Sequence, residues 1–159
     1  MESKMKPEEQ SMPIDYGIVA DVMRFAVEHG RERGFNVACG VVDPSGRPLG
    51  VLKHPDALWT TPDMALGKAT LASAFREPTA PLFERWQRER PQYGVSIAAW
   101  GVGNGWFAVE GGVPVKVGDG GVVAAAIGIS GGFPATIDAE IADVAVERMI
   151  ALLGDSSQG

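Results

Sequence analysis

The stretch EGGVPVKVGDGGVVAAAIGISGG, from Glu110 to Gly132, decides the predicted fold. A glycine-rich turn at 118–121 joins two apolar runs, and a connection this short permits only antiparallel pairing of neighbouring strands. Pro114 cannot donate a hydrogen bond to a sheet, so it predicts an edge position or an irregular start for the first run. The second run, 122–130, is apolar almost throughout, which predicts a central strand covered on both faces.

Amphipathic helices are predicted near both ends of the chain. Apolar residues recur at helical spacing over 15–33 and again over 137–152. Two such helices can cover one face of a sheet. After the first helix, the AspProSerGly turn at 43–46 joins two β-strand patterns into a hairpin.

The middle of the chain is predicted to contain two helices and then a further hairpin. The first helix opens near Pro62, and a second, shorter helix follows the break at 77–79. The runs ValSerIleAlaAlaTrp (95–100) and TrpPheAlaValGlu (106–110), with AsnGly between them, predict the hairpin. The complete pattern predicts an α+β fold, with helices layered on an antiparallel sheet of about five strands.

Length and charge set bounds on the class of protein. The 159 residues predict a single domain over 14–153, between a flexible arm at 1–13 and a tail at 154–159. The net charge of −6 disfavours nonspecific binding of nucleic acid or of an anionic membrane. No apolar run has the length of a membrane span, and the N-terminus lacks the apolar core of a signal peptide, so the expected location is cytoplasmic. Cys39 is the only cysteine and is expected in the core.

Two cations mark the helix that opens near Pro62. Lys68 and Arg76 lie on or beside its apolar faces, and a buried cation needs a carboxylate, solvent or an acidic ligand. Glu110 and Asp138 are the carboxylates that the pattern offers, so an internal ion pair and a bound acid both remain open. The SerGlyGly segment at 130–132 either cradles an anion or allows close packing.

The two histidines and Ser130 are further candidates for reactive groups. His29 continues the apolar stripe of the first helix and is expected to pack there. His54, in a loop after the first hairpin, is either an exposed loop histidine or the best candidate for haem ligation or proton transfer. Two histidines and one cysteine at distant positions predict no metal site of the zinc type. Ser130 has the spacing of a nucleophile elbow but no His and Asp partners in triad order.

Several motifs in order resemble the GlcG/HbpS-like haem-binding family, also called the haem-degrading domain, over about 14–153. The motifs are VVDPSGRP (41–48), KATLASAFREPT (68–79), GGVP (111–114) and AIGISGG (126–132), followed by Asp138 and its helix. The resemblance implies a profilin-like, five-stranded antiparallel sheet with helices on both sides. It also implies a homo-oligomer and a small-molecule ligand, which is haem in some members.

The resemblance also suggests site residues. Where members often carry an Arg-Met-Asp-Gly-Ala loop, this chain has LysHisProAspAla, in which only Asp56 and Ala57 match, and Asp56 becomes a candidate for ligand binding. The start of the first helix has no histidine, so His54 is the only plausible histidine ligand of a haem.

Three functions follow from these patterns. The first is binding of a carboxylate-bearing small molecule, haem or another small acid. The second is a cofactor-free lyase, isomerase or hydrolase acting on a small organic acid, in which Glu110 or His54 moves a proton. The third is an oligomeric accessory subunit whose four tryptophans pack cores and subunit contacts. The candidate ligand-binding residues are Lys68, Arg76, Asp56 and Asp138.

Overall fold

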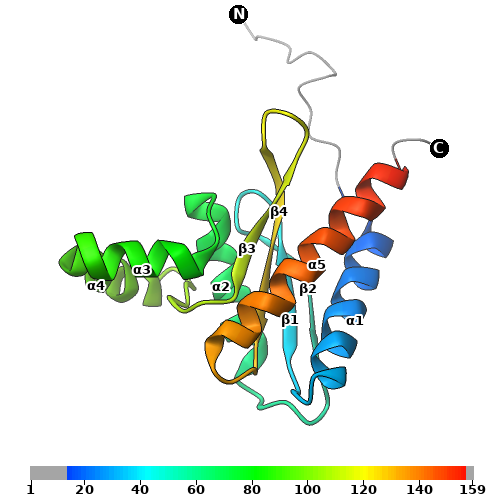
Figure 1. Ribbon diagram of the computed structural model, residues 1–159, viewed down its shortest axis with the longest axis horizontal. Helices are drawn as coiled ribbons and strands as arrows, with labels where there is room; N and C mark the ends of the chain where they lie inside the picture. The colour runs from blue at the N-terminus through cyan, green and yellow to red at the C-terminus, as the bar shows by residue number, and fades with distance from the viewer. Residues whose placement is uncertain (1–13, 157–159) are drawn as a thin grey trace, which may run out of the picture.

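The computed structural model describes residues 14–156 (Figure 1). The arm predicted at 1–13 and the last residues, 157–159, lie outside the described part. Within it, no helix is both long enough and apolar enough to span a membrane. The elements in chain order are α1 (Tyr16–Glu32), β1 (Ala38–Val42), β2 (Pro48–Lys53), α2 (Thr61–Phe75), α3 (Thr79–Glu89), α4 (Pro91–Val102), β3 (Gly112–Val117), β4 (Val122–Ser130) and α5 (Ala135–Ser156).

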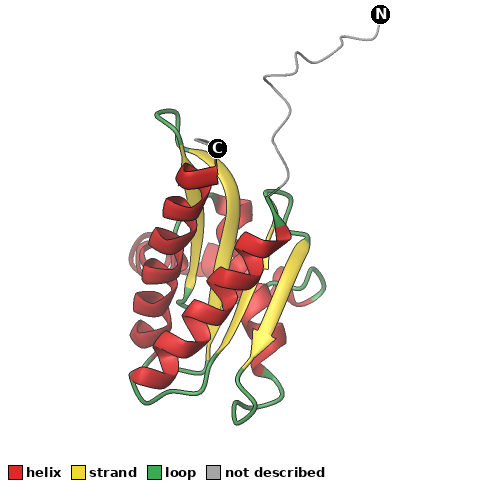
Figure 2. Cartoon of the chain, turned by 90° about the vertical axis from the view of Figure 1, so that its right-hand side faces the viewer, coloured by secondary structure: helices red, strands yellow, loops and turns green. Residues whose placement is uncertain are grey.

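The sheet is antiparallel and has the strand order β2-β1-β4-β3. Helices α1 and α5 lie side by side against one face, and α2 covers the other (Figures 1 and 2). The α+β fold with flanking helices is confirmed, as are the edge position of Pro114 on β3 and the central position of β4. Residues 154–156, expected in the tail, belong to α5.

The prediction of a five-stranded sheet is wrong, because the described sheet has four strands. The run 95–100 lies in α4, and 106–110 is an irregular segment that leads into β3. Pro91 suits the first turn of a helix, and a short apolar run without alternation fits a helix as well as a strand. Aromatic packing then favours the helix, since the Trp100 and Trp106 rings meet edge to face at 4.8 Å.

Two layers of apolar side chains hold the helices to the sheet. The larger core lies between the sheet and the α1–α5 pair, and it includes Cys39 and Ile127. The smaller one lies under α2, where Gly128 on β4 faces the Ala65 backbone so closely that any side chain would collide with the Ala65 carbonyl. Close approach of α2 to the sheet brings Lys68 to the carboxyl end of β4, which sets up the candidate site.

Candidate functional site

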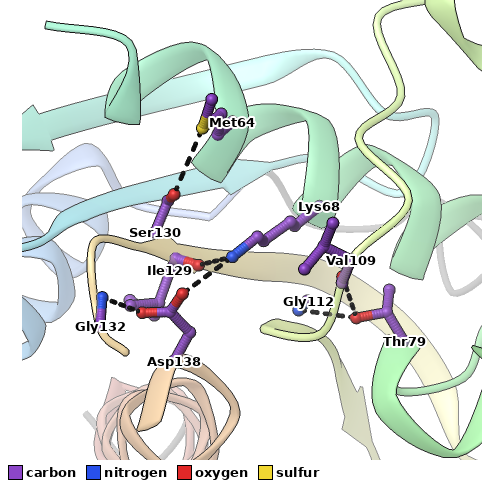
Figure 3. A network of polar contacts seen from close by, with 9 residues as sticks. All are labelled: Met64, Lys68, Thr79, Val109, Gly112, Ile129, Ser130, Gly132 and Asp138. Carbon is purple, nitrogen blue, oxygen red and sulfur yellow. Dashed lines mark hydrogen bonds and ion pairs between the residues drawn. The ribbon is translucent and has the colours of Figure 1, made fainter. Parts of the chain in front are cut away.

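A buried ion pair joins α2 to α5 at the end of β4 (Figure 3). The Lys68 ammonium lies 2.9 Å from Oδ2 of Asp138 and donates a second hydrogen bond, of 2.8 Å, to the Ile129 carbonyl oxygen. Lys68 is 2% exposed and Asp138 is 3% exposed. Between the two possibilities left open for Lys68, the geometry therefore favours an internal ion pair, with Asp138 as its direct partner.

Burial shifts both members of the pair towards their neutral forms. It lowers the pKa of Lys68 from its ordinary value of 10.5, and the carboxylates of Asp138 and Glu110 oppose this shift. It also raises the pKa of Asp138 above 3.8, against the effects of the Lys68 ammonium and of the backbone N–H groups of Gly132 and Gly131. Glu110 is thus close enough to act electrostatically on Lys68.

The SerGlyGly segment holds one of the chain's own carboxylates. The Gly132 N–H donates a 2.7 Å hydrogen bond to Oδ1 of Asp138, which lies in the first turn of α5 (Figure 3). A helix N-terminus with free backbone N–H groups favours negative charge. Asp138 supplies that charge from within the protein, so the segment needs no external anion.

Thr79 fixes the segment that leads into β3, and sequence reasoning gave it no role. Its hydroxyl donates a 2.9 Å hydrogen bond to the Val109 carbonyl oxygen and accepts one of 3.0 Å from the Gly112 N–H (Figure 3). The two bonds span Glu110 and hold its backbone between two fixed points. A threonine at the start of a helix is commonly a cap, so the sequence contains no signal for this longer-range contact.

A cavity of about 540 Å³ lies between α3, α4 and the segment before β3. We call it the α3–α4 cavity. Its volume lies within the range common for sites that bind small molecules. Of its lining residues, all in the described part of the chain, only Glu110 has an ionisable side chain. The lining residues are Phe83, Trp86, Gln87, Pro91, Gly94, Val95, Ala98, Ala108, Val109, Glu110 and Ala135.

The sequence did not indicate this cavity, because half of its wall was predicted to be a β-hairpin. The apolar spacing on α3 does predict that Phe83 and Trp86 lie on the packed side of this helix. In the structure Trp86 is buried and Phe83 is half-buried. Burial of the other wall depends on α4, whose helical state is fixed by tertiary contacts. Glu110 is the one candidate from the sequence that lines the cavity.

The remaining candidates lie elsewhere. Arg76 is exposed where α2 ends, in a left-handed conformation with φ of 57°. His54 and Asp56 lie in the loop after β2, where the His54 Nδ1 atom accepts a 3.1 Å hydrogen bond from the Asp56 N–H. None of these three residues lines the α3–α4 cavity.

A second, smaller hollow of about 250 Å³ lies along the outer surface of α1 and reaches α5. His29 lines it and stacks against Phe25, with ring centroids 6.0 Å apart, which agrees with its expected packing role. Its rim carries the Arg148–Asp21 ion pair. Among residues 14–156, no three His, Cys, Asp or Glu side chains converge as they would around a metal ion.

Comparisons with known proteins agree with the fold and with the motifs. The family model of HbpS-like haem-degrading proteins matches residues 14–147, whereas a comparison with curated proteins gives no match. Klebsiella pneumoniae ORFY has a similar structure, with a TM-score of 0.76 and 23% identity over 92% of this chain and 97% of that one. That identity shows the fold alone.

Two further solved structures are similar at slightly higher identity. A double mutant of Streptomyces reticuli HbpS is 25% identical, with a TM-score of 0.73 over 91% of this chain and 93% of that one. The PduOC complex with haem is 26% identical, with a TM-score of 0.72 over 86% of this chain and 95% of that one. Because the family model spans most of the described fold, the resemblance seen in the motifs is confirmed, and the chain belongs to the HbpS-like haem-degrading protein family.

Proposed function

We propose that this protein binds a small organic molecule in the α3–α4 cavity. The observation that carries the proposal is an apolar, partly aromatic cavity of about 540 Å³ with one carboxylate-bearing residue, Glu110, in its wall. Sites of this kind combine an apolar surface, which supplies most of the affinity, with a few polar groups that orient the ligand. The family and the similarity to a haem complex support small-molecule binding in general.

The apolar lining of this cavity suits the ring of a haem, but within residues 14–156 it offers none of the usual ligands of the iron. The iron of a protein-bound haem usually takes an axial His, Cys, Met or Tyr, and none of these lines the cavity in the described part of the chain. His54, the predicted haem ligand, lies in the loop after β2. A haem in the cavity would therefore be held through contacts of its ring, without an axial ligand from the lining residues.

An acid-bearing ligand remains a prediction. Lys68 already binds Asp138, so it would have to exchange partners to bind a ligand carboxylate. In the cavity itself, such a carboxylate would meet Glu110, and two like charges repel each other strongly in an apolar surrounding. We therefore expect acids to bind best in their protonated form, at low pH.

An enzyme acting on a small organic acid is the second candidate function. Glu110 favours it, because a carboxylate in an apolar cavity beside a lysine is suited to general acid or base catalysis. The proposed reactions are those of a cofactor-free lyase, isomerase or hydrolase. Under this hypothesis, Glu110→Gln abolishes turnover and leaves the circular dichroism spectrum unchanged.

Assembly into a homo-oligomer and a cytoplasmic location also remain proposals. Exposed apolar side chains on the loop after β2 and on α4 support assembly, since such surfaces often lie in subunit contacts. The residues concerned are Leu58, Trp59, Val95, Trp100 and Val102. Light scattering on the purified chain measures the number of subunits directly.

Blocking the cavity tests the proposed function. Ala98 lines the cavity, whereas its neighbour Ala99 is exposed and does not, so Ala98→Phe and Ala99→Phe form a matched pair. A panel containing haemin, small aromatic molecules and small carboxylic acids is screened by thermal unfolding. A ligand at 100 times its Kd stabilises the folded state by about 2.7 kcal/mol, which raises the Tm by several degrees.

We expect at least one ligand to raise the Tm of the wild type and of Ala99→Phe but not that of Ala98→Phe. Haemin binding is followed in parallel by its Soret band, with His54→Ala as the test of the predicted histidine ligand. A ligand that stabilises Ala98→Phe as much as the wild type would show that binding occurs outside the cavity. No response to any member of the panel would also contradict the proposal.

A further inference from the structure

We propose that the ligand of the α3–α4 cavity is an organic cation, an ammonium group on an apolar body. This inference rests on the proposed function, because it names the chemical class that the same cavity binds. It derives from the charges at the cavity wall and from the partners that those charges already have.

The positive charge of Lys68, next to the cavity, is already neutralised. Two of the three N–H groups of Lys68 bind the Asp138 carboxylate and the Ile129 carbonyl oxygen. A side chain added at Gly111 would lie 3.2 Å from the Lys68 nitrogen, so the backbone next to Glu110 packs directly against this ammonium. One negative charge is in excess among Lys68, Asp138 and Glu110. It belongs to Glu110, which lines the cavity.

Glu110 itself has no partner in the described part of the chain. No side chain or backbone N–H of residues 14–156 donates a hydrogen bond to its carboxylate, and no Lys or Arg forms an ion pair with it. The residue is only half-buried, so water can reach its carboxylate. A ligand that fills the cavity displaces this water, and a carboxylate then needs a donor, preferably a charged one.

The aromatic wall favours the same class of ligand. Trp86 lines the cavity, is 3% exposed, and is held edge to face by Phe83 and Tyr93 with centroid distances of 5.4 Å to each. Aromatic faces attract cations, and aromatic residues whose orientation is fixed lose little entropy when a ligand binds. Phe83 is half-buried and lines the cavity together with Glu110, so its ring offers a suitable surface for an ammonium group with an apolar body, and the contact with Trp86 fixes its position.

An anionic ligand lacks an equivalent partner. Within residues 14–156, no Lys or Arg lines the cavity. The arginines of α3 are engaged outside it, because Arg85 binds Glu77 and Arg88 binds Glu84 and Glu89. A ligand carboxylate would therefore lie near Glu110 without a cation to compensate it.

Three probes of similar shape and different charge test the inference. They are 2-phenylethylammonium, neutral 2-phenylethanol and anionic 3-phenylpropanoate, each titrated calorimetrically into the full chain at pH 7.5. We expect the ammonium to bind about tenfold more tightly than the alcohol, as one charge-assisted hydrogen bond implies, and the carboxylate to bind more weakly than the alcohol. The order of affinities on the wild type tests the inference even if a variant fails to fold.

Removal of the charge provides the second measurement. Glu110→Gln should weaken binding of the ammonium about tenfold and change binding of the alcohol less than about twofold. Glu84→Gln is the matched control, because Glu84 lies on α3, is exposed and does not line the cavity. This control should bind all three probes as the wild type does.

The outcomes separate this inference from the proposed function. If the alcohol binds as tightly as the ammonium, or if the carboxylate binds most tightly, the cationic ligand is refuted and the cavity remains a binding site. An ammonium that binds Glu110→Gln as tightly as the wild type refutes it too. If all three probes bind Ala98→Phe and the wild type with identical heats, they bind outside the cavity and this inference fails. The proposed function fails as well only if no ligand of the screening panel distinguishes the two proteins.

Discussion

Breaking the buried ion pair with Asp138→Asn should destabilise the protein strongly. The substitution keeps the size of the side chain, and the new amide oxygen can still accept the hydrogen bond from the Gly132 N–H. It removes the negative charge 2.9 Å from the Lys68 ammonium. The new amide can place its NH₂ group there, and this group, like the ammonium, donates hydrogen bonds and cannot accept them. The perturbation therefore acts almost entirely on the pairing with Lys68.

The expected magnitude follows from burial. Lys68 is 2% exposed, so water cannot replace the lost partner, and the Ile129 carbonyl oxygen remains as its one hydrogen-bond acceptor among residues 14–156. Removing one member of a buried ion pair costs about 3–5 kcal/mol, because the other charge stays buried without compensation. For a domain of this length, such a loss lowers the Tm on the order of 10 °C.

Urea unfolding followed by circular dichroism measures the free energy of unfolding of Asp138→Asn and of two comparison variants. Asp21→Asn makes the same change at the half-exposed Asp21–Arg148 pair, where solvent replaces the lost contact, so a small effect is expected. The double variant Lys68→Met with Asp138→Asn removes the stranded ammonium as well. It should be more stable than Asp138→Asn alone, because Met fills the space of the aliphatic part of the lysine.

Two results would refute this reasoning. An Asp138→Asn protein as stable as the Asp21→Asn protein would show that the buried pair contributes no more than a surface pair. A double variant less stable than Asp138→Asn alone would show that the loss did not come from an uncompensated charge on Lys68.

Three further predictions concern burial and packing. Burial raises the pKa of Cys39 to about 12, so Ellman's reagent at pH 8 should modify this thiol in urea but not in the folded protein. Gly128→Ala should cost about 3 kcal/mol in urea unfolding, because the added methyl group meets the Ala65 carbonyl. Gly120→Ala adds a methyl group with no atom of residues 14–156 within 4 Å and should change the free energy of unfolding little. Equal losses for the two variants would contradict the packing argument. Because burial lowers the pKa of Lys68 below 10.5, the unfolded chain binds this proton more tightly than the folded one, and stability gains a contribution that increases as pH rises through the lowered pKa towards 10.5. Urea unfolding at a series of alkaline pH values should show this contribution in the wild type and not in Lys68→Met, and identical slopes for the two proteins would refute it.

Local sequence patterns predicted most of the elements correctly. The turns at 43–46 and 118–121 each join antiparallel strands, and the end helices cover one face of the sheet as expected. Helix α2 and the burial of Lys68 on it also follow from spacing, because residues three and four positions apart share a face of a helix. These features depend on neighbours in the sequence, so the sequence contains them.

The site was predictable only in part. The pattern indicates that Lys68 needs a partner and that Glu110 and Asp138 are the available carboxylates, and the structure brings the three close together. Arg76 was expected on or beside an apolar face of α2 but is exposed in a left-handed conformation at the helix end. The helix already stops at Phe75, so helical spacing no longer determines where this side chain lies.

By itself, the amino-acid sequence determined the fold class, the family, the two tight hairpins and the helices at both ends, since glycine turns and apolar periodicity act over a few residues. Only the tertiary structure decided that 91–102 forms a helix, that Asp138 rather than Glu110 binds Lys68, and that a cavity lies beside Glu110. An apolar run without alternation is compatible with both helix and strand, and a buried cation takes the carboxylate that packing places within reach. Both outcomes depend on contacts between residues far apart in the chain, here the aromatic packing around α4 and the approach of α5 to α2.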